Sequence, residues 1–124
     1  MREIHIGDQT RRIDCNAFTV YAYSELKGGA DLKNVLAEFE RNGELAALPM
    51  NTLLEVLWAM EKTCNPTIAP YPAWLADLPV EVLDLTDMGS WVIEVVDLLT
   101  TTFFRQSLKQ NLVAEVRQEA ETAS

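Results

Sequence analysis

The sequence predicts a mainly α-helical fold, a small helical bundle with an N-terminal β-hairpin. Near the N-terminus, in residues 2–14, apolar and polar side chains alternate with the period of a strand. Apolar residues recur with helical period in residues 16–42 and again in 87–105. Between them, residues 51–63 are apolar around most of a helical cylinder, which is typical of a helix buried inside a bundle. The rest of the domain is therefore expected to pack around this segment.

The N-terminal hairpin follows from its turn and its alternation. Gly7-Asp8-Gln9 has turn chemistry, and the chain can return as a strand from Thr10 to Ile13. Its apolar face would consist of Ile4, Ile6 and Ile13. An isolated hairpin is marginal in water, so this face is expected to lie on the helices.

Two helices are predicted next, over residues 16–27 and 31–42. Asn16 or Asp14 can cap the first, and Gly28-Gly29 ends it. Its expected apolar face is Phe18, Tyr21, Ala22 and Leu26. Asp31 caps the second, whose amphipathic face is Leu32, Val35, Leu36 and Phe39. A further turn is possible over residues 44–48.

The central helix has a start signal and a stop signal. Thr52 and Glu55 have the spacing of a capping box, in which the hydroxyl and the carboxylate satisfy free backbone N–H groups. Asn65-Pro66 ends the helix, because proline lacks an N–H and disfavours helical geometry in its predecessor.

Four prolines then interrupt the pattern between residues 66 and 79. One short helix fits there, with Pro72 in its first turn and an apolar side of Trp74, Leu75 and Leu78. Residues 80–85 are expected as an extended loop rather than a strand. The longest helix should follow, over residues 87–105. Its main apolar stripe is Met88, Trp91, Val92, Val95, Leu99 and Phe103.

This last helix has more apolar residues than one face can hold. The surplus consists of Ile93, Val96, Leu98 and Phe104. The helix is therefore expected either to be central or to keep part of its surface for a partner. Residues 1–105 are thus expected to form a single helical domain with the hairpin, and residues 106–124 a surface helix or a frayed tail.

Composition excludes several classes of function. Ten basic residues against nineteen acidic ones give a formal charge of −9, so nucleic acid is a poor partner. No apolar run approaches the roughly 18–20 residues that cross a membrane, and the charged N-terminus does not resemble a signal peptide. The protein is expected to stay where it is made. Cys15 and Cys64 stand apart, outside any metal or redox motif, and are expected as free buried thiols.

The sequence contains little that could carry catalysis. His5 is the only histidine, and on its strand it is expected to face solvent in a structural role. Carboxylates gather at Asp84, Asp87, Glu94 and Asp97, where helix capping and a solvated face explain them better than a metal ion. We therefore expect no catalytic residue, no metal ligand and no cofactor.

The residues expected to contact a partner are aromatic or lie beside aromatic residues. They are Trp74, Trp91, Phe103, Phe104 and Arg105. Two of the three tryptophans should be internal, and Trp74 or Trp91 is the one expected to reach the surface. Phe103 and Phe104 point about 100° apart on a helix, so they cannot both face one core. The alternative is that the C-terminal extension covers one of them.

The order of these segments resembles a known family. They are, in order, IHIGDQTRRI, NAFTVYAYSELKGG, LLEVLWAMEKT, YPAWLADL and WVIEVVDLLTTTFFR. Together they resemble the tail assembly chaperones of long-tailed, siphovirus-type bacteriophages and prophages of Gram-positive hosts. The likeness spans roughly residues 3–105, and its most distinctive part is LWAMEK followed by the aromatic-Trp-Leu segment.

The resemblance implies a small, mostly helical, non-enzymatic protein of the host bacterial cytoplasm. Such a chaperone binds the hydrophobic tape measure protein, keeps it soluble and helps recruit tail tube subunits, then leaves before the virion is complete. In this family a ribosomal frameshift often makes a longer second product. Apart from the resemblance, the surplus apolar residues of the 87–105 helix have a competing use in self-association, which would make the protein a homo-oligomer. The main alternative is a small acidic regulator that binds one protein target, such as an antitoxin-like inhibitor.

Overall fold

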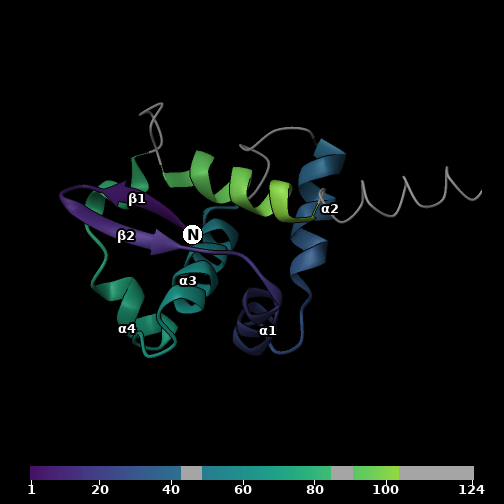
Figure 1. Ribbon diagram of the computed structural model, residues 1–124, viewed down its shortest axis with the longest axis horizontal. Coiled ribbons are helices and arrows are strands. Elements are labelled where there is room, and N and C mark those ends of the chain that lie inside the picture. The colour runs from purple at the N-terminus through teal and green to yellow at the C-terminus, as the bar shows by residue number, and fades with distance from the viewer. Residues whose placement is uncertain (43–48, 85–90, 104–124) are drawn as a thin grey trace, which may run out of the picture.

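The computed structural model describes residues 1–42, 49–84 and 91–103, with the backbone alone for residues 39–42. Figure 1 shows a two-stranded antiparallel hairpin among helices, which confirms the predicted fold class. The elements are β1 (Arg2–Ile6), β2 (Gln9–Ile13), α1 (Ala17–Leu26), α2 (Leu32–Asn42), α3 (Met50–Cys64), α4 (Tyr71–Ala76), the 3₁₀ helix η2 (Val80–Leu83) and a helix over residues 91–103.

The hairpin has the predicted strands and apolar face. β1 and β2 pair in a register that places Ile6 opposite Gln9 and Arg2 opposite Ile13. Gly7 takes a φ of 59°, a left-handed conformation that glycine adopts without strain. The buried side chains are Ile4, Ile6 and Ile13, as expected.

The boundaries of α1 are confirmed, but its orientation is not. The Asn16 side chain accepts the Phe18 N–H at 2.8 Å, and the chain leaves the helix through two glycines with positive φ. Tyr21, however, is 60% exposed, which corrects the predicted apolar face. The Thr19 hydroxyl lies 2.6 Å from that of Thr63 on α3, so α1 is turned to bury Thr19, Ala22 and Tyr23.

The start of α2 is as predicted. Asp31 Oδ1 accepts the Lys33 N–H at 3.0 Å, and the buried residues are Leu32, Val35 and Leu36. The Phe39 side chain, the turn considered for residues 44–48 and the tail 106–124 lie outside the described residues.

Helix α3 is the centre of the fold. Every side chain from Leu53 to Glu61 is buried, and the helix packs against α1 and β2. The predicted capping box is wrong, because the helix begins earlier, at Met50 after Pro49, and no side chain caps it. Thr52 therefore lies inside the first turn. The helix ends at Cys64, as the Asn65-Pro66 signal predicted.

Proline placement explains the next two elements. Pro72 lies in the first turn of α4, as predicted, and Trp74 is buried. Residues 80–83 form a 3₁₀ helix, which corrects the expected extended loop. Pro79 has the extended backbone that can precede a helix, and its carbonyl accepts the Val82 N–H at 3.1 Å.

The 91–103 helix, green to yellow in Figure 1, closes the core beside β1. Arg2 of β1 pairs with Glu94 at 3.2 Å and also with Asp97. Trp91, Val92, Val95 and Leu99 are buried as predicted. Two of the surplus residues, Val96 and Leu98, are buried as well, which agrees with the alternative that this helix is central. The helix start at residue 87, Met88 and Phe104 lie outside the described residues.

Candidate functional site

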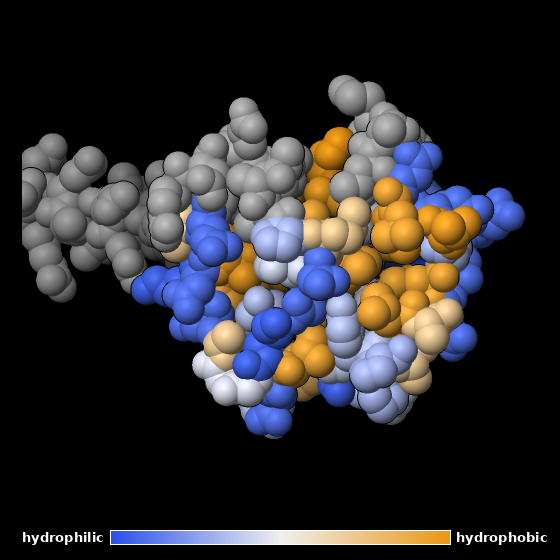
Figure 2. Space-filling model, turned by 180° about the vertical axis from the view of Figure 1, so that it is seen from behind, coloured by the Kyte–Doolittle hydropathy of each residue, from blue (hydrophilic) through white to orange (hydrophobic). Residues whose placement is uncertain are grey.

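Exposed apolar side chains are the first candidates for a partner contact. Val80 is 75% exposed and Leu83 is 57% exposed. In a 3₁₀ helix, residues three apart lie on the same side, so these two side chains project together from η2. Ile93, 40% exposed, is the one surplus residue of the 91–103 helix that the structure leaves on the surface. Figure 2 shows apolar surface divided among polar areas on the face opposite to that in Figure 1.

The predicted contact residues are more buried than expected. Trp58, Trp74 and Trp91 all lie in the core, so the expectation that Trp74 or Trp91 reaches the surface is wrong. Each indole N–H also has a partner: Trp58 donates to the Ala69 carbonyl at 3.1 Å, Trp74 to Glu61 Oε2 at 3.0 Å and Trp91 to the Val82 carbonyl at 2.8 Å. These bonds allow large aromatic side chains to be internal.

Phe103 is half-buried and packs against the core. Phe104 and Arg105 lie outside the described residues. The prediction that one of the two adjacent phenylalanines contacts another chain therefore stays a prediction.

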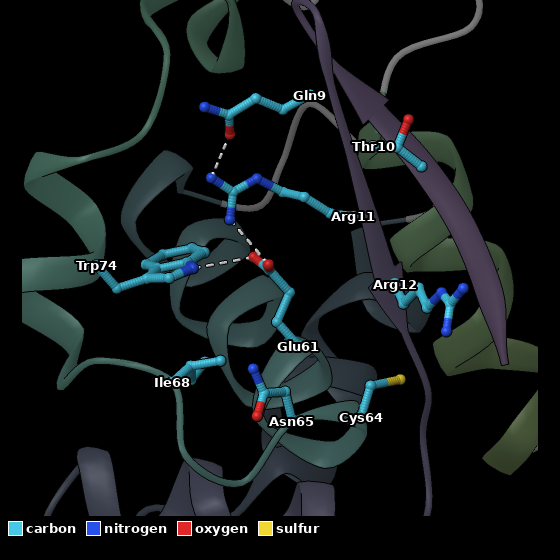
Figure 3. A pocket seen from close by; sticks show the side chains of 9 residues that line it. All are labelled: Gln9, Thr10, Arg11, Arg12, Glu61, Cys64, Asn65, Ile68 and Trp74. Carbon is cyan, nitrogen blue, oxygen red and sulfur yellow. Dashed lines mark hydrogen bonds and ion pairs between the residues drawn. The ribbon is translucent and has the colours of Figure 1, made fainter.

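A groove of about 620 Å³ lies between β2, the end of α3 and α4 (Figure 3). Its lining residues are Gln9, Thr10, Arg11, Arg12, Glu61, Cys64, Asn65, Ile68 and Trp74. Trp74 was predicted as a contact residue but the groove was not, because its walls come from segments 49–65 residues apart in the chain.

Glu61 forms the polar centre of this groove. Arg11 Nη1 donates to Glu61 Oε1 at 2.8 Å, and the Trp74 indole bonds the other oxygen (Figure 3). The second Arg11 nitrogen, Nη2, donates a hydrogen bond to Gln9 Oε1. Burial raises the pKa of the Glu61 carboxyl, although the bonds from Arg11 and Trp74 favour the charged form and oppose that rise. The network joins β2, α3 and α4, which indicates a structural role.

A second buried carboxylate joins α1 to α3. Lys27 Nζ lies 2.8 Å from Glu55 Oε2, and Glu55 raises the pKa of the Lys27 ammonium. Burial, with the nearby Glu55 charge, raises the pKa of Tyr23 and of Tyr71. One signal was visible in the sequence: Glu55 and Glu61 are the two acids in the otherwise apolar segment 53–61, and each needed a partner.

The residues considered for catalysis are placed as follows. His5 is exposed, as predicted, and its Nδ1 lies 3.2 Å from the Thr10 hydroxyl. Cys15 is a buried free thiol, and Cys64 is free but only half-buried. Within the described ranges, no group of three or more histidine, cysteine or acidic residues could hold a metal ion. In the same ranges, no helix has the length and apolarity to cross a membrane.

Comparison of the chain with models of known protein families, with curated proteins and with solved structures found no match.

Proposed function

We propose that this protein is a phage tail assembly chaperone, which binds the tape measure protein, keeps it soluble and helps recruit tail tube subunits. The observation that carries the proposal is the order of its apolar and aromatic segments along residues 3–105. A mainly helical fold with an N-terminal hairpin accords with that resemblance. The protein acts in the host cytoplasm, without catalysis or cofactor, and is not part of the finished virion.

The exposed apolar side chains suggest how such a chaperone meets its client. An aggregation-prone helical client needs apolar contacts on a carrier that itself stays in solution. Val80 and Leu83 project together from η2, while the chain has a formal charge of −9. Charge of this size limits association of the carrier with itself. We therefore infer that the first client contact is at η2, with Ile93 and Phe103 of the 91–103 helix as further candidates.

Co-expression with the tape measure protein encoded just downstream tests the proposal. The wild-type chain should increase the soluble fraction of the tape measure protein and co-purify with it. The double variant Val80→Ser/Leu83→Ser should lose most of this effect, because both side chains are exposed and their removal leaves the core intact. Tyr21→Ser is the matched control, since Tyr21 is 60% exposed, within the range of the other two side chains, and lies on another helix, α1.

If the tape measure protein stays insoluble and unbound with the wild-type chain, the chaperone proposal is wrong. The acidic regulator that binds one protein target then becomes the better hypothesis. If the wild type succeeds and the double variant performs equally well, the chaperone proposal stands but the contact is not at η2.

A further inference from the structure

The outer edge of β2 borders the groove, and the ladder pattern shows which of its backbone groups point away from β1. Gly7 has a positive φ and Asp8 does not, which is the pattern of a type II′ two-residue hairpin turn. Such a turn makes Ile6 and Gln9 a hydrogen-bonded pair. Hydrogen-bonded and non-hydrogen-bonded pairs alternate in an antiparallel ladder. The N–H and C=O groups of Thr10 and Arg12 therefore point away from β1.

These outward groups have no partner in the part of the chain that the structure describes. The backbone bonds outside helices and strands include none from Thr10 or Arg12. Both residues are exposed and both line the groove. An unpaired strand edge of this kind is a template for another strand.

The groove has room for one extended segment. Its volume of about 620 Å³ is within the roughly 300–1,000 Å³ typical of ligand sites. The wall opposite β2 includes Asn65, Ile68 and Trp74, so the groove has the β2 edge on one side and the end of α3 with α4 on the other. We propose that the outer edge of β2 binds an extended peptide as a third strand of the sheet, by β-strand addition.

The side chains of the groove define the peptide. Arg11 is already paired with Glu61, whereas the Arg12 side chain is 64% exposed and, among the described residues, forms an ion pair with Glu3 alone, at 3.9 Å. A carboxylate on the added strand opposite Arg12 completes an opposite-charge cross-strand pair. Neighbouring residues of the peptide point to the other face, where Ile68 offers an apolar contact. The ligand is thus an extended segment that alternates acidic or polar with apolar residues. This site does not depend on the proposed function.

The test uses a fluorescein-labelled peptide of alternating valine and threonine with one central glutamate, and follows fluorescence anisotropy. The wild-type chain should bind it with a dissociation constant below about 1 mM. Thr10→Pro should weaken binding by at least about tenfold, because it removes an outward N–H and places a ring on the pairing edge. The hairpin itself loses no ladder bond in this variant.

His5→Pro is the matched control. His5 is the cross-strand partner of Thr10, so the same substitution removes an outward N–H from the opposite edge. It should leave peptide affinity unchanged within about twofold. Circular dichroism should show the same helical content in both variants. Arg12→Glu should weaken binding of the glutamate peptide and strengthen binding of its lysine counterpart.

Three outcomes would overturn the proposal. One is no binding by the wild type at about 1 mM peptide, and another is equal loss in the two proline variants. The third is a wild-type dimer that Thr10→Pro alone converts to a monomer, which would mean that a second copy occupies the edge. Slowed amide exchange at Thr10 and Arg12 on peptide addition, with no change at His5, would support the proposal directly.

Discussion

At the scale of single residues, most polar groups within the core have a hydrogen-bond partner, and among the described residues Arg11 Nε is the buried side-chain atom that lacks one. The Glu61 carboxylate accepts hydrogen bonds from Arg11 and Trp74, and the Glu55 carboxylate forms an ion pair with Lys27. Each of the three buried indole N–H groups donates a hydrogen bond. A buried carboxylate without such partners would be costly, because it would lose its hydration without compensation. The carboxylates therefore hold particular elements together rather than performing chemistry.

Glu61 should make stability depend on pH in a direction unusual for an acid. Burial raises the pKa of Glu61 above 4.5, so the folded state binds this proton more tightly than the unfolded state. The free energy of unfolding of the wild type, relative to Glu61→Gln, should therefore fall as pH rises from about 4.5 through the folded pKa, then level off. Urea unfolding across that pH range measures it. If the free energy of unfolding of the wild type relative to Glu61→Gln instead grows with pH, the pairing with Arg11 lowers the pKa of Glu61 by more than burial raises it.

The two thiols should differ in reactivity. Burial raises the pKa of Cys15 and of Cys64, so both have little thiolate at neutral pH. Cys15 is also shielded from reagent, whereas Cys64 is half-buried at the groove. Iodoacetamide at about pH 8 should modify Cys64 first, and mass spectrometry can assign the site. Modification of Cys15 at the rate of a free peptide thiol would contradict the buried position.

At the scale of elements, local signals set most boundaries. Asn16 caps α1, Asp31 starts α2 and glycines end α1. The exception is α3, where Pro49 begins the helix ahead of the expected cap at Thr52. Proline with an extended backbone can precede a helix without a side-chain cap, so the downstream capping pattern is not used.

Alanine substitution at Asn16 and at Thr52 should distinguish a residue that caps its helix from one that does not. Asn16→Ala should lower the free energy of unfolding by about 1 kcal/mol, because a first-turn N–H loses its acceptor. Thr52→Ala should cost less than about 0.5 kcal/mol, since Thr52 caps nothing. Chemical denaturation of both variants measures this. If both variants lose the same free energy of unfolding, Thr52 does cap α3 and the capping box is present.

At the scale of the whole molecule, chain segments far apart in sequence close one core. The hairpin contributes its isoleucines, α3 passes through the middle, and the 91–103 helix lies beside β1. Arg2 links the first strand to this last described helix, 92 and 95 residues away. The charged side chains of this link remain partly exposed, so their ion pairs contribute less to the stability of the fold than the burial of apolar side chains does.

Removing Arg2 should have a small effect that depends on salt. Arg2→Ala should lower the free energy of unfolding by roughly 0.2–1 kcal/mol in dilute buffer, and by less at high salt, where exposed charges are screened. Arg12→Ala is the matched control, because its pair with Glu3 is longer, at 3.9 Å, and more exposed. A large, salt-independent loss for Arg2→Ala would show that its packing matters more than its charge.

Prediction from sequence was better for the fold than for the candidate site. The hairpin, the two helices after it and the proline-started α4 were found because their signals act over a few residues. The partner contacts were predicted less well. Trp74 and Trp91 proved internal, and the exposed Val80 and Leu83 were hidden in a segment expected to be a loop.

By itself, the sequence determined the fold class, the alternation of the hairpin and most helix ends, because caps, glycines and prolines act on their immediate neighbours. The tertiary structure alone decided how α1 is turned, which apolar residues of the 91–103 helix are covered, and that Arg11 meets Glu61. A helix with apolar residues on several sides has no preferred direction until its neighbours are in place. Likewise, a carboxylate 50 residues from its partner has no local signal for that pairing.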